Sequence, residues 1–288
     1  MKTIRNAGML LLIIVFFLNS SFWIGNTPEE GIRVIQNVFT KSRDVHGLKL
    51  TMLMTERIGD TYQKKKADFK IKYDPLSIYL KQEYPNPGLE VLYVKGENNG
   101  DAWINPNGFP WITMSMDPLG STMRKGQHHS IFKSGFEFFL TVLQHLYDKY
   151  QSEAATMIEF DGTVKYGDVL CYKITVNNPN FNYVDYTVRP GENLETLSRK
   201  LFVCDYMIYD LNPQLSSYED IKPGTKLKVP NDYGKQFVLY IDTQKLVPAG
   251  VKIYDDKGLF EEYSYLNTII NPSFSNMEFT ESYAGYGF

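Results

Sequence analysis

Short segments in which apolar and polar residues alternate, separated by clusters of proline, glycine and asparagine, run through most of this 288-residue chain. A period of two places successive side chains on opposite faces of a strand, so such segments predict half-buried β-strands. The clearest apolar series are Leu48, Leu50, Met52 and Met54, and then Phe69, Ile71 and Tyr73. A chain with this pattern folds around sheets rather than as a helical bundle.

About eleven segments fit the strand pattern, and most of them are joined by short connections. They are 48–54, 68–73, 77–83, 89–95, 100–104, 110–116, 156–164, 168–177, 236–242, 250–255 and 259–266. Helical spacing occurs after Thr27, where Ile32, Ile35, Val38 and Phe39 recur, and again over 135–150. Regular strand–helix alternation, which a doubly wound sheet needs, is missing. The sequence therefore predicts an α+β fold in which an open, curved antiparallel sheet carries helices on one face.

The stretch from Tyr186 to Pro230 has a different character and reads as strand, helix, helix, strand. Asn193 is a plausible N-cap for the first helix, and Asn212-Pro213 ends the second. Turn-rich segments, 177–180 and 230–232, flank it, as expected at the borders of an inserted unit. We therefore expect a host domain in two pieces, 27–180 and 231–288, around an insert at 186–230.

The first residues have the pattern of an export signal. Lys2 and Arg5 precede an uncharged run from Met9 to Leu18, followed by the polar residues 19–21. We interpret residues 1–24 as a signal peptide or, if it is not cleaved, an N-terminal anchor. No cysteine precedes Cys171, so lipid attachment next to this signal is excluded. The expected location is the periplasm or cell envelope.

Composition excludes two classes of protein. A formal net charge of -3 argues against a basic nucleic-acid binder. Two cysteines cannot form a disulfide framework, although Cys171 and Cys204 can either pair across the border of the insert or remain free thiols. Both alternatives stay open from the sequence alone.

The insert resembles a LysM domain over residues 186–230. It shares the order Tyr-Thr-Val, Pro-Gly-Glu-Asn-Leu, a first helix, Leu-Asn-Pro, Ile-x-Pro-Gly and a final Leu-x-Val-Pro. The resemblance implies binding of glycans that contain N-acetylglucosamine, chiefly peptidoglycan. The family's sugar groove lies between two loops, which here contain Gly191, Glu192, Asn193 and Leu194, and then Ile221, Lys222, Pro223 and Gly224.

Two interpretations of these eight residues are open. The loops hold a sugar acetamido group through close backbone amides and the apolar side chains of Leu194 and Ile221, or the same residues serve only the turns of the unit. Glu192 and Lys222 are expected to be exposed and neutral to folding. The insert departs from the family at two positions, because Phe202 stands where glycine is usual and Cys204 where serine or threonine commonly caps the second helix.

The rest of the chain is similar to LolA-like carriers and resembles a bacterial envelope family of unknown function (domain-of-unknown-function family 1571 type). The resemblance is carried by 240–248 and by 251–258, a strand pair with a glycine turn. It implies an open antiparallel half-barrel with an apolar concave face for lipid or lipoprotein acyl chains. The two apolar series listed above are candidates for that face, and core packing is the alternative for each of them.

Motifs for catalysis or metal binding are weak. His128-His129 lacks a third ligand at a suitable spacing, and the S-x-x-K of Ser130 to Lys133 lacks its partner motifs. We predict no catalytic residue, no metal and no cofactor. The predicted function is that of a non-enzymatic envelope protein that binds peptidoglycan or N-acetylglucosamine oligomers through the insert. The alternative is a lipid or lipoprotein carrier in which the LysM-like unit is incidental.

Overall fold

The computed structural model describes residues 26–288. The predicted signal peptide or anchor at 1–24 lies outside the described residues. Among residues 26–288, no helix is both long enough and apolar enough to cross a membrane.

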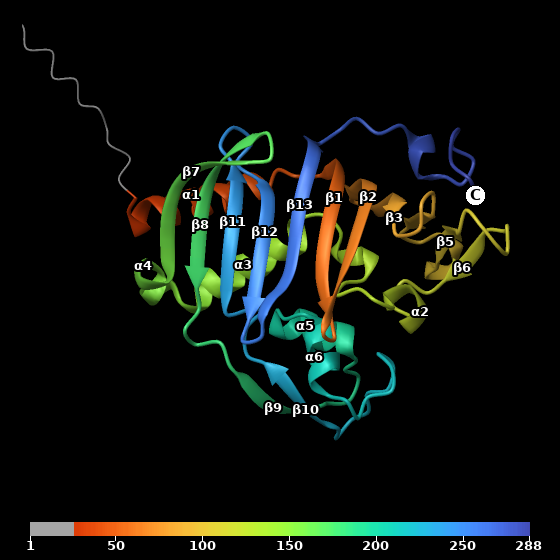
Figure 1. The fold of residues 1–288 in the computed structure, drawn as a ribbon. Coiled ribbons are helices and arrows are strands. Elements are labelled where there is room, and N and C mark those ends of the chain that lie inside the picture. Colours follow the sequence, from red (N-terminus) through yellow and green to blue (C-terminus); the bar gives the residue numbers. More distant parts are fainter. Residues whose placement is uncertain (1–25) are drawn as a thin grey trace, which may run out of the picture.

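Two sheets and six α-helices make up the described chain (Figure 1). The helices are α1 (Pro28–Ser42), α2 (Ser121–Arg124), α3 (Glu137–Lys149), α4 (Ala154–Met157), α5 (Leu194–Leu201) and α6 (Asp205–Leu211). The strands before the insert are β1 (Gly47–Ile58), β2 (Thr61–Tyr73), β3 (Leu76–Tyr84), β4 (Glu90–Val94), β5 (Ala102–Asn105), β6 (Met114–Met116), β7 (Ile158–Tyr166) and β8 (Val169–Asn177). The remaining strands are β9 (Tyr183–Thr187), β10 (Lys226–Pro230), β11 (Gln236–Asp242), β12 (Pro248–Asp255) and β13 (Gly258–Ile270).

The large sheet is antiparallel and has eleven strands within residues 26–288, in the order β6-β5-β4-β3-β2-β1-β13-β12-β11-β8-β7. Strands from both sides of the insert share this sheet. Because β8 and β11 are neighbours, the chain leaves the sheet after Asn177 and returns beside the same strand at Gln236. The excursion between them holds β9, α5, α6 and β10, and it lies below the sheet in Figure 1.

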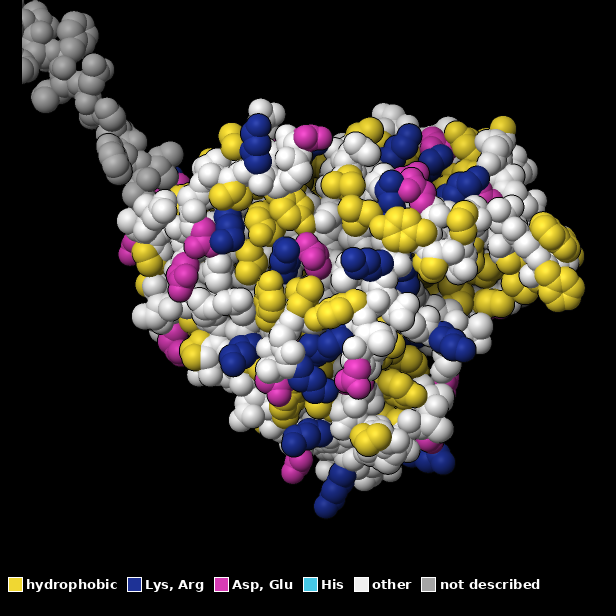
Figure 2. Space-filling model, viewed as in Figure 1, with side chains coloured by type: hydrophobic (Ala, Val, Ile, Leu, Met, Phe, Trp, Pro, Cys, Tyr) yellow, Lys and Arg dark blue, Asp and Glu magenta, His cyan; other side chains and the backbone are white. Residues whose placement is uncertain are grey.

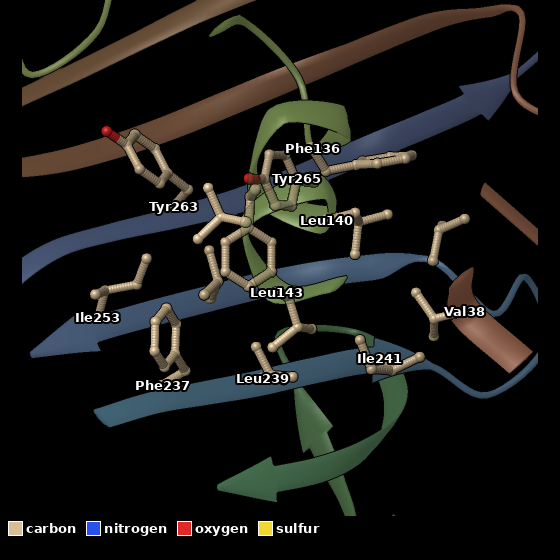
Figure 3. Close-up of a cluster of buried hydrophobic side chains, with 14 of the residues drawn as sticks. Val38, Phe136, Leu140, Leu143, Phe237, Leu239, Ile241, Ile253, Tyr263 and Tyr265 are labelled. Carbon is tan, nitrogen blue, oxygen red and sulfur yellow. The ribbon is translucent and has the colours of Figure 1, made fainter. Parts of the chain in front are cut away.

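Helices cover one face of the sheet on its β7 to β13 side. The helix α1 begins after the N-cap Thr27, and α3 runs across the same face (Figure 1). Apolar side chains from α1, α3 and β11 to β13 interlock there, including Val38, Leu143, Phe237 and Tyr265 (Figure 3). This half of the sheet has a filled core. The predicted α+β class, with an open antiparallel sheet and packed helices, is confirmed.

The structure shortens one predicted strand and decides between the two alternatives for the cysteines. The segment 110–116 is a strand only over Met114–Met116, because Pro110 lacks a backbone donor and Trp111 has a left-handed φ of 62°. The suggested disulfide does not form. Cys171 lies in β8, where its backbone pairs with Val164 and Asp242, whereas the Cys204 thiol lies 3.8 Å from the carbonyl oxygen of His128. Both thiols are free and buried.

Candidate functional site

The two loops of the predicted glycan groove lie side by side at one end of the β9–β10 pair. Val188 donates to the carbonyl of Thr225 at 3.0 Å, and Gly224 donates to the carbonyl of Val188 at 2.9 Å. Since β9 and β10 are antiparallel, the loop that leaves β9 and the loop that enters β10 must meet at this end. The structure thus brings the two halves of the eight-residue set together.

The side chains of the eight predicted residues divide into exposed and buried groups. Gly191, Asn193, Lys222, Pro223 and Gly224 are exposed, and Glu192 is intermediate. Leu194 and Ile221 instead pack in the small core of the insert, with exposed fractions of 1% and 9%. Contrary to the prediction, Leu194 and Ile221 therefore offer little apolar surface to a sugar methyl group. The accessible surface consists of loop backbone and polar groups.

Glu192 braces its own loop and is not a free surface carboxylate. Its oxygens accept from the Tyr186 hydroxyl at 2.8 and 2.9 Å, from the backbone N–H of Arg189 at 2.9 Å and from Lys200 Nζ at 2.7 Å. The bond from Lys200, followed by the bond from the Arg189 amide, lowers the pKa of Glu192 to about 2. The side chain of Glu192 is thus less exposed than expected, and it holds its loop through these hydrogen bonds.

Asn193 is the N-cap of α5, as predicted. Its side-chain oxygen accepts from the backbone of Thr196 at 2.8 Å, and the Thr196 hydroxyl accepts from the Asn193 backbone at 2.9 Å. This reciprocal cap fixes the start of the helix and with it the direction of the loop. Gly191 and Gly224 have φ of +82° and +88°, with no atom within 4 Å of where a Cβ would be, so their surface is open.

The opposite side of the insert docks on the host through buried charges. Arg124 of α2 forms an ion pair with Asp205 of α6, and both side chains are almost fully buried. Lys133 Nζ lies 3.3 Å from Asp205 and 3.4 Å from Glu195. Phe202, where the family has glycine, adopts a left-handed φ of 54° and stacks on His145 of α3 at 4.0 Å. The departure from the family pattern is thus a host contact.

The host sheet is hollow on its β1 to β6 side. A cavity of about 480 Å³ lies between these strands and the segment 122–139, which we call the strap. Its apolar lining includes five of the ten methionines of the chain, namely Met52, Met54, Met114, Met116 and Met123. The volume is within the range of small-molecule pockets, and methionine side chains adapt to ligands of varied shape.

Only part of the predicted concave face lines this cavity. Met52, Met54 and Phe69 line it, although Met52 and Phe69 are also part of the core cluster. Leu48, Leu50 and Ile71 belong to that core cluster and do not line the cavity. Tyr73 packs beside that core, and its buried hydroxyl has no hydrogen-bond partner in the described residues. The sequence indicated the strands that carry the cavity but not the residues 114–139 that close it.

One end of the cavity is polar. Glu56 and Glu261 are buried there, bridged by Tyr263, whose hydroxyl lies 2.6 Å from Glu56 and 3.2 Å from Glu261. Lys65 lies 3.4 Å from Glu56, and His129 lies 3.2 Å from Glu261. Burial opposes ionisation of both carboxyls, but the histidines, Lys65 and the hydroxyl hydrogen bonds outweigh it, so the pKa of Glu56 and of Glu261 is lowered.

An apolar tip projects from the connection between β5 and β6, beside the cavity-lining residues of those strands. Phe109, Trp111 and Ile112 have exposed fractions of 87%, 76% and 62%. Figure 2 shows hydrophobic side chains protruding at this end of the molecule. Pro106 and Met114, on either side of the tip, line the cavity.

The S-x-x-K of the strap is not arranged as a nucleophile and base. Lys133 Nζ donates to Ser198 Oγ at 3.1 Å and pairs with Asp205, both from the insert. Ser130 is buried, and its hydroxyl has no hydrogen-bond partner among the described residues. Lys133 therefore serves the junction between host and insert.

Fold and loops together define a two-part protein, an open-sheet host that carries a small strand–helix–helix–strand unit. The model of the family "Protein of unknown function (DUF1571)" matches residues 45–187, and the LysM domain model matches residues 186–230. Residues 186–230 are a LysM domain, and they follow directly on a segment of the DUF1571 family. No curated protein matches the chain.

Several solved structures are distantly similar to the chain. A DUF1329 family protein from Desulfovibrio piger shares 10% identity, with 89% of this chain and 98% of that chain covered and a TM-score of 0.34. A LolA superfamily protein from Nitrosomonas europaea shares 9% identity, with 86% and 98% covered and a TM-score of 0.33. The lipoprotein LppX from Mycobacterium tuberculosis shares 11% identity, with 84% and 96% covered and a TM-score of 0.38. Similarity at this level assigns no ligand.

Proposed function

We propose that this protein is a non-enzymatic component of the bacterial cell envelope that binds peptidoglycan, or oligomers of N-acetylglucosamine, through its LysM domain. The observation that carries the proposal is the division of the insert into two sides. Its docking contacts come from Glu195, Phe202 and Asp205, while the loops with Gly191 and Gly224 remain exposed. A LysM domain retained only for packing has no need to keep these loops free of host contacts.

The exposed loop backbone suits recognition of an acetamido group. A glycine without neighbouring atoms lets a sugar approach the backbone closely, and the N–H and carbonyl groups of the loops supply directional hydrogen bonds. We place the binding surface on Gly191, Asn193, Lys222, Pro223 and Gly224, with Glu192 holding its loop in shape.

The test is binding of the full chain to insoluble peptidoglycan, and to N-acetylglucosamine oligomers by calorimetry. Gly191→Asn combined with Gly224→Asn puts side chains into the groove at little backbone strain, because asparagine tolerates left-handed φ better than most residues. We expect about tenfold weaker binding, equivalent to about 1.4 kcal/mol. Gly167→Asn is the matched control, since Gly167 is also left-handed, with φ of +58°, and has open space in the β7–β8 turn.

Equal binding by the double variant and the wild type would mean that these two loops do not bind the glycan. Deleting residues 186–230 is a poorer test, because Arg124 and Lys133 of the host would lose their buried partners.

The cavity supports a second function, binding of an apolar molecule such as a lipid acyl chain. Its walls are mostly apolar and adaptable, and the tip at Phe109 and Trp111 carries aromatic side chains of the kind enriched at membrane interfaces. A ligand that moves between a bilayer and the cavity would enter most directly at this tip.

Displacement of a fluorescent fatty acid from the full chain tests the cavity. Ala67 lines the cavity from β2, so Ala67→Leu reduces the free volume and should weaken probe binding several-fold. Lys64→Leu is the control, because Lys64 is exposed and lies three residues earlier on the same strand, outside the cavity lining. If both variants bind the probe like the wild type, the cavity is not the binding site.

A further inference from the structure

Ligand atoms of the kinds that bind metal ions converge where the insert meets the host. A ring nitrogen of His128, the Cys204 Sγ atom and a carboxylate oxygen of Glu261 all lie within 4.8 Å of one another, and all three residues are buried. His129 Nε2 lies 3.2 Å from the Glu261 Oε2 atom, and a ring nitrogen of His129 lies within 4.8 Å of Cys204 Sγ in a second group with Asp205. The residues come from the strap, from α6's N-cap and from β13, three segments that are far apart in sequence.

The hydrogen bonds of His128 determine which ring nitrogen is free. Nε2 lies 2.8 Å from the carbonyl oxygen of Arg57, which can only accept, so Nε2 carries a proton. Nδ1 lies 2.7 Å from the Glu261 carboxylate. A nitrogen lone pair and a carboxylate oxygen repel at that distance unless a positive charge lies between them. Either a proton or a metal ion fills this role, and a histidine bonded to a backbone carbonyl is the usual form of a metal ligand.

The Cys204 side chain packs in the main core cluster, and its thiol makes one weak hydrogen bond, to the backbone carbonyl of His128 at 3.8 Å. Cys204 is the N-cap of α6, yet its side chain makes no capping hydrogen bond. The Sγ atom points into the host instead, toward His128. Serine or threonine would cap the helix better. The cysteine instead places a sulfur atom beside two histidines and a carboxylate.

We propose that His128, Cys204 and Glu261, with His129 as the fourth ligand, form a structural zinc site that joins the LysM domain to the host. The mixed nitrogen, sulfur and oxygen set is typical of zinc. Because the protein supplies all ligands and the site is buried, the ion would hold the LysM domain against the host. One ligand from the insert and three from the host fix their relative orientation.

Zinc binding at this site requires the release of protons and a small movement of the ligand atoms. His129 Nε2 lies 2.9 Å from the Tyr233 hydroxyl, which itself donates to Glu261, so Nε2 carries a proton that must move to the unpartnered Nδ1 when Nε2 binds the ion. Zinc also displaces the proton of the Cys204 thiol and the proton shared by His128 and Glu261, so two protons leave for each ion bound. Tetrahedral zinc with bonds of about 2.0–2.3 Å separates its ligand atoms by about 3.2–3.8 Å. The His128–Glu261 pair must therefore open by about half an ångström when the metal enters.

The experiment measures the metal content of the tag-free full chain after incubation with zinc and gel filtration. We expect about one zinc ion per chain. Replacement by Co²⁺ should give a near-ultraviolet thiolate-to-cobalt charge-transfer band, a signature that a nearby histidine or carboxylate cannot produce. Cys204→Ser should abolish the band and weaken zinc binding by about tenfold or more. Cys171→Ser, at the only other cysteine, should retain both.

Two results would overturn the site. One is a wild-type chain that holds no zinc above the blank and gives no cobalt–thiolate band, which leaves a proton between His128 and Glu261. The other is a folded Cys204→Ser variant with undiminished zinc affinity. If Cys204→Ser fails to fold, the cobalt spectrum of the wild type with Cys171→Ser still decides, since only Cys204 can then supply the thiolate.

Discussion

The LysM loops and the host cavity are two candidate binding sites of opposite construction. The loops are formed by two short, locally folded segments, and their surface is exposed and polar. The cavity is partly open and largely apolar, with lining residues that range from Met52 to Tyr265. A site made from local turns is visible in a sequence motif, whereas a site made by the closure of a sheet depends on contacts between distant segments.

The two sites share a wall, so their independence can be tested. The strap lines the cavity with Met123 and Ile131, and it holds the insert with Arg124 and Lys133. A substitution that loosens the strap should affect both the LysM loops and the cavity. A substitution in the loops alone, or in the cavity wall away from the strap, should affect only one of them.

The largest effect is expected for the buried ion pair at this shared wall. Arg124→Met leaves Asp205 buried with only Lys133 as a partner, and it removes the guanidinium that lies 3.9 Å from the Tyr218 ring centroid. Breaking a buried pair by removing one partner costs about 3–5 kcal/mol. Denaturant unfolding of the full chain measures this loss.

Arg199→Met is the matched control, because Arg199 also pairs with an acidic residue of the insert, Glu195 at 2.7 Å, but is 50% exposed. Its cost should stay below about 1 kcal/mol. Equal losses for the two variants would show that the junction is not held by buried charge.

The next effect separates the filled half of the sheet from the hollow half. Leu143 is 2% exposed in the interlocked core of α3, so Leu143→Ala should cost about 2–5 kcal/mol. Met54→Ala removes a side chain that already faces the cavity, so it should cost about 1 kcal/mol or less. The unfolding midpoints of the two variants give the comparison, and similar losses would mean that the cavity half is as tightly packed as the core.

Sequence patterns predicted the strands, both long helices and the LysM unit, because each depends on local periodicity and turn residues. They failed where tertiary contacts decide. Leu194 and Ile221 carry the motif of the groove but pack in the insert core. Glu192, which precedes α5, is held by Lys200, eight residues later in the chain. The zinc site that we propose has no local motif, because His128 and His129 have no third ligand near them in sequence. Cys204 and Glu261 reach them only through the fold.

The smallest effect concerns the pKa of Glu192. It tests whether the hydrogen bonds of this carboxylate hold the LysM loop in its conformation. The pKa of Glu192 lies at about 2, below its ordinary value of 4.5, chiefly because Lys200 and the Arg189 amide donate to the carboxylate. A lowered carboxyl pKa means that the folded state favours the ionised form, so the stabilising contribution of the Glu192 carboxylate is present above pH 4.5 and is lost as the pH falls through about 2.

We expect the amide NMR signal of Arg189 to stay constant from pH 6 to 3. Glu192→Gln should already shift that signal at neutral pH, since the neutral amide cannot form the pair with Lys200. A change in the wild-type signal with a midpoint near 4.5 would mean that the carboxylate is free in solution and that the loop lacks this brace.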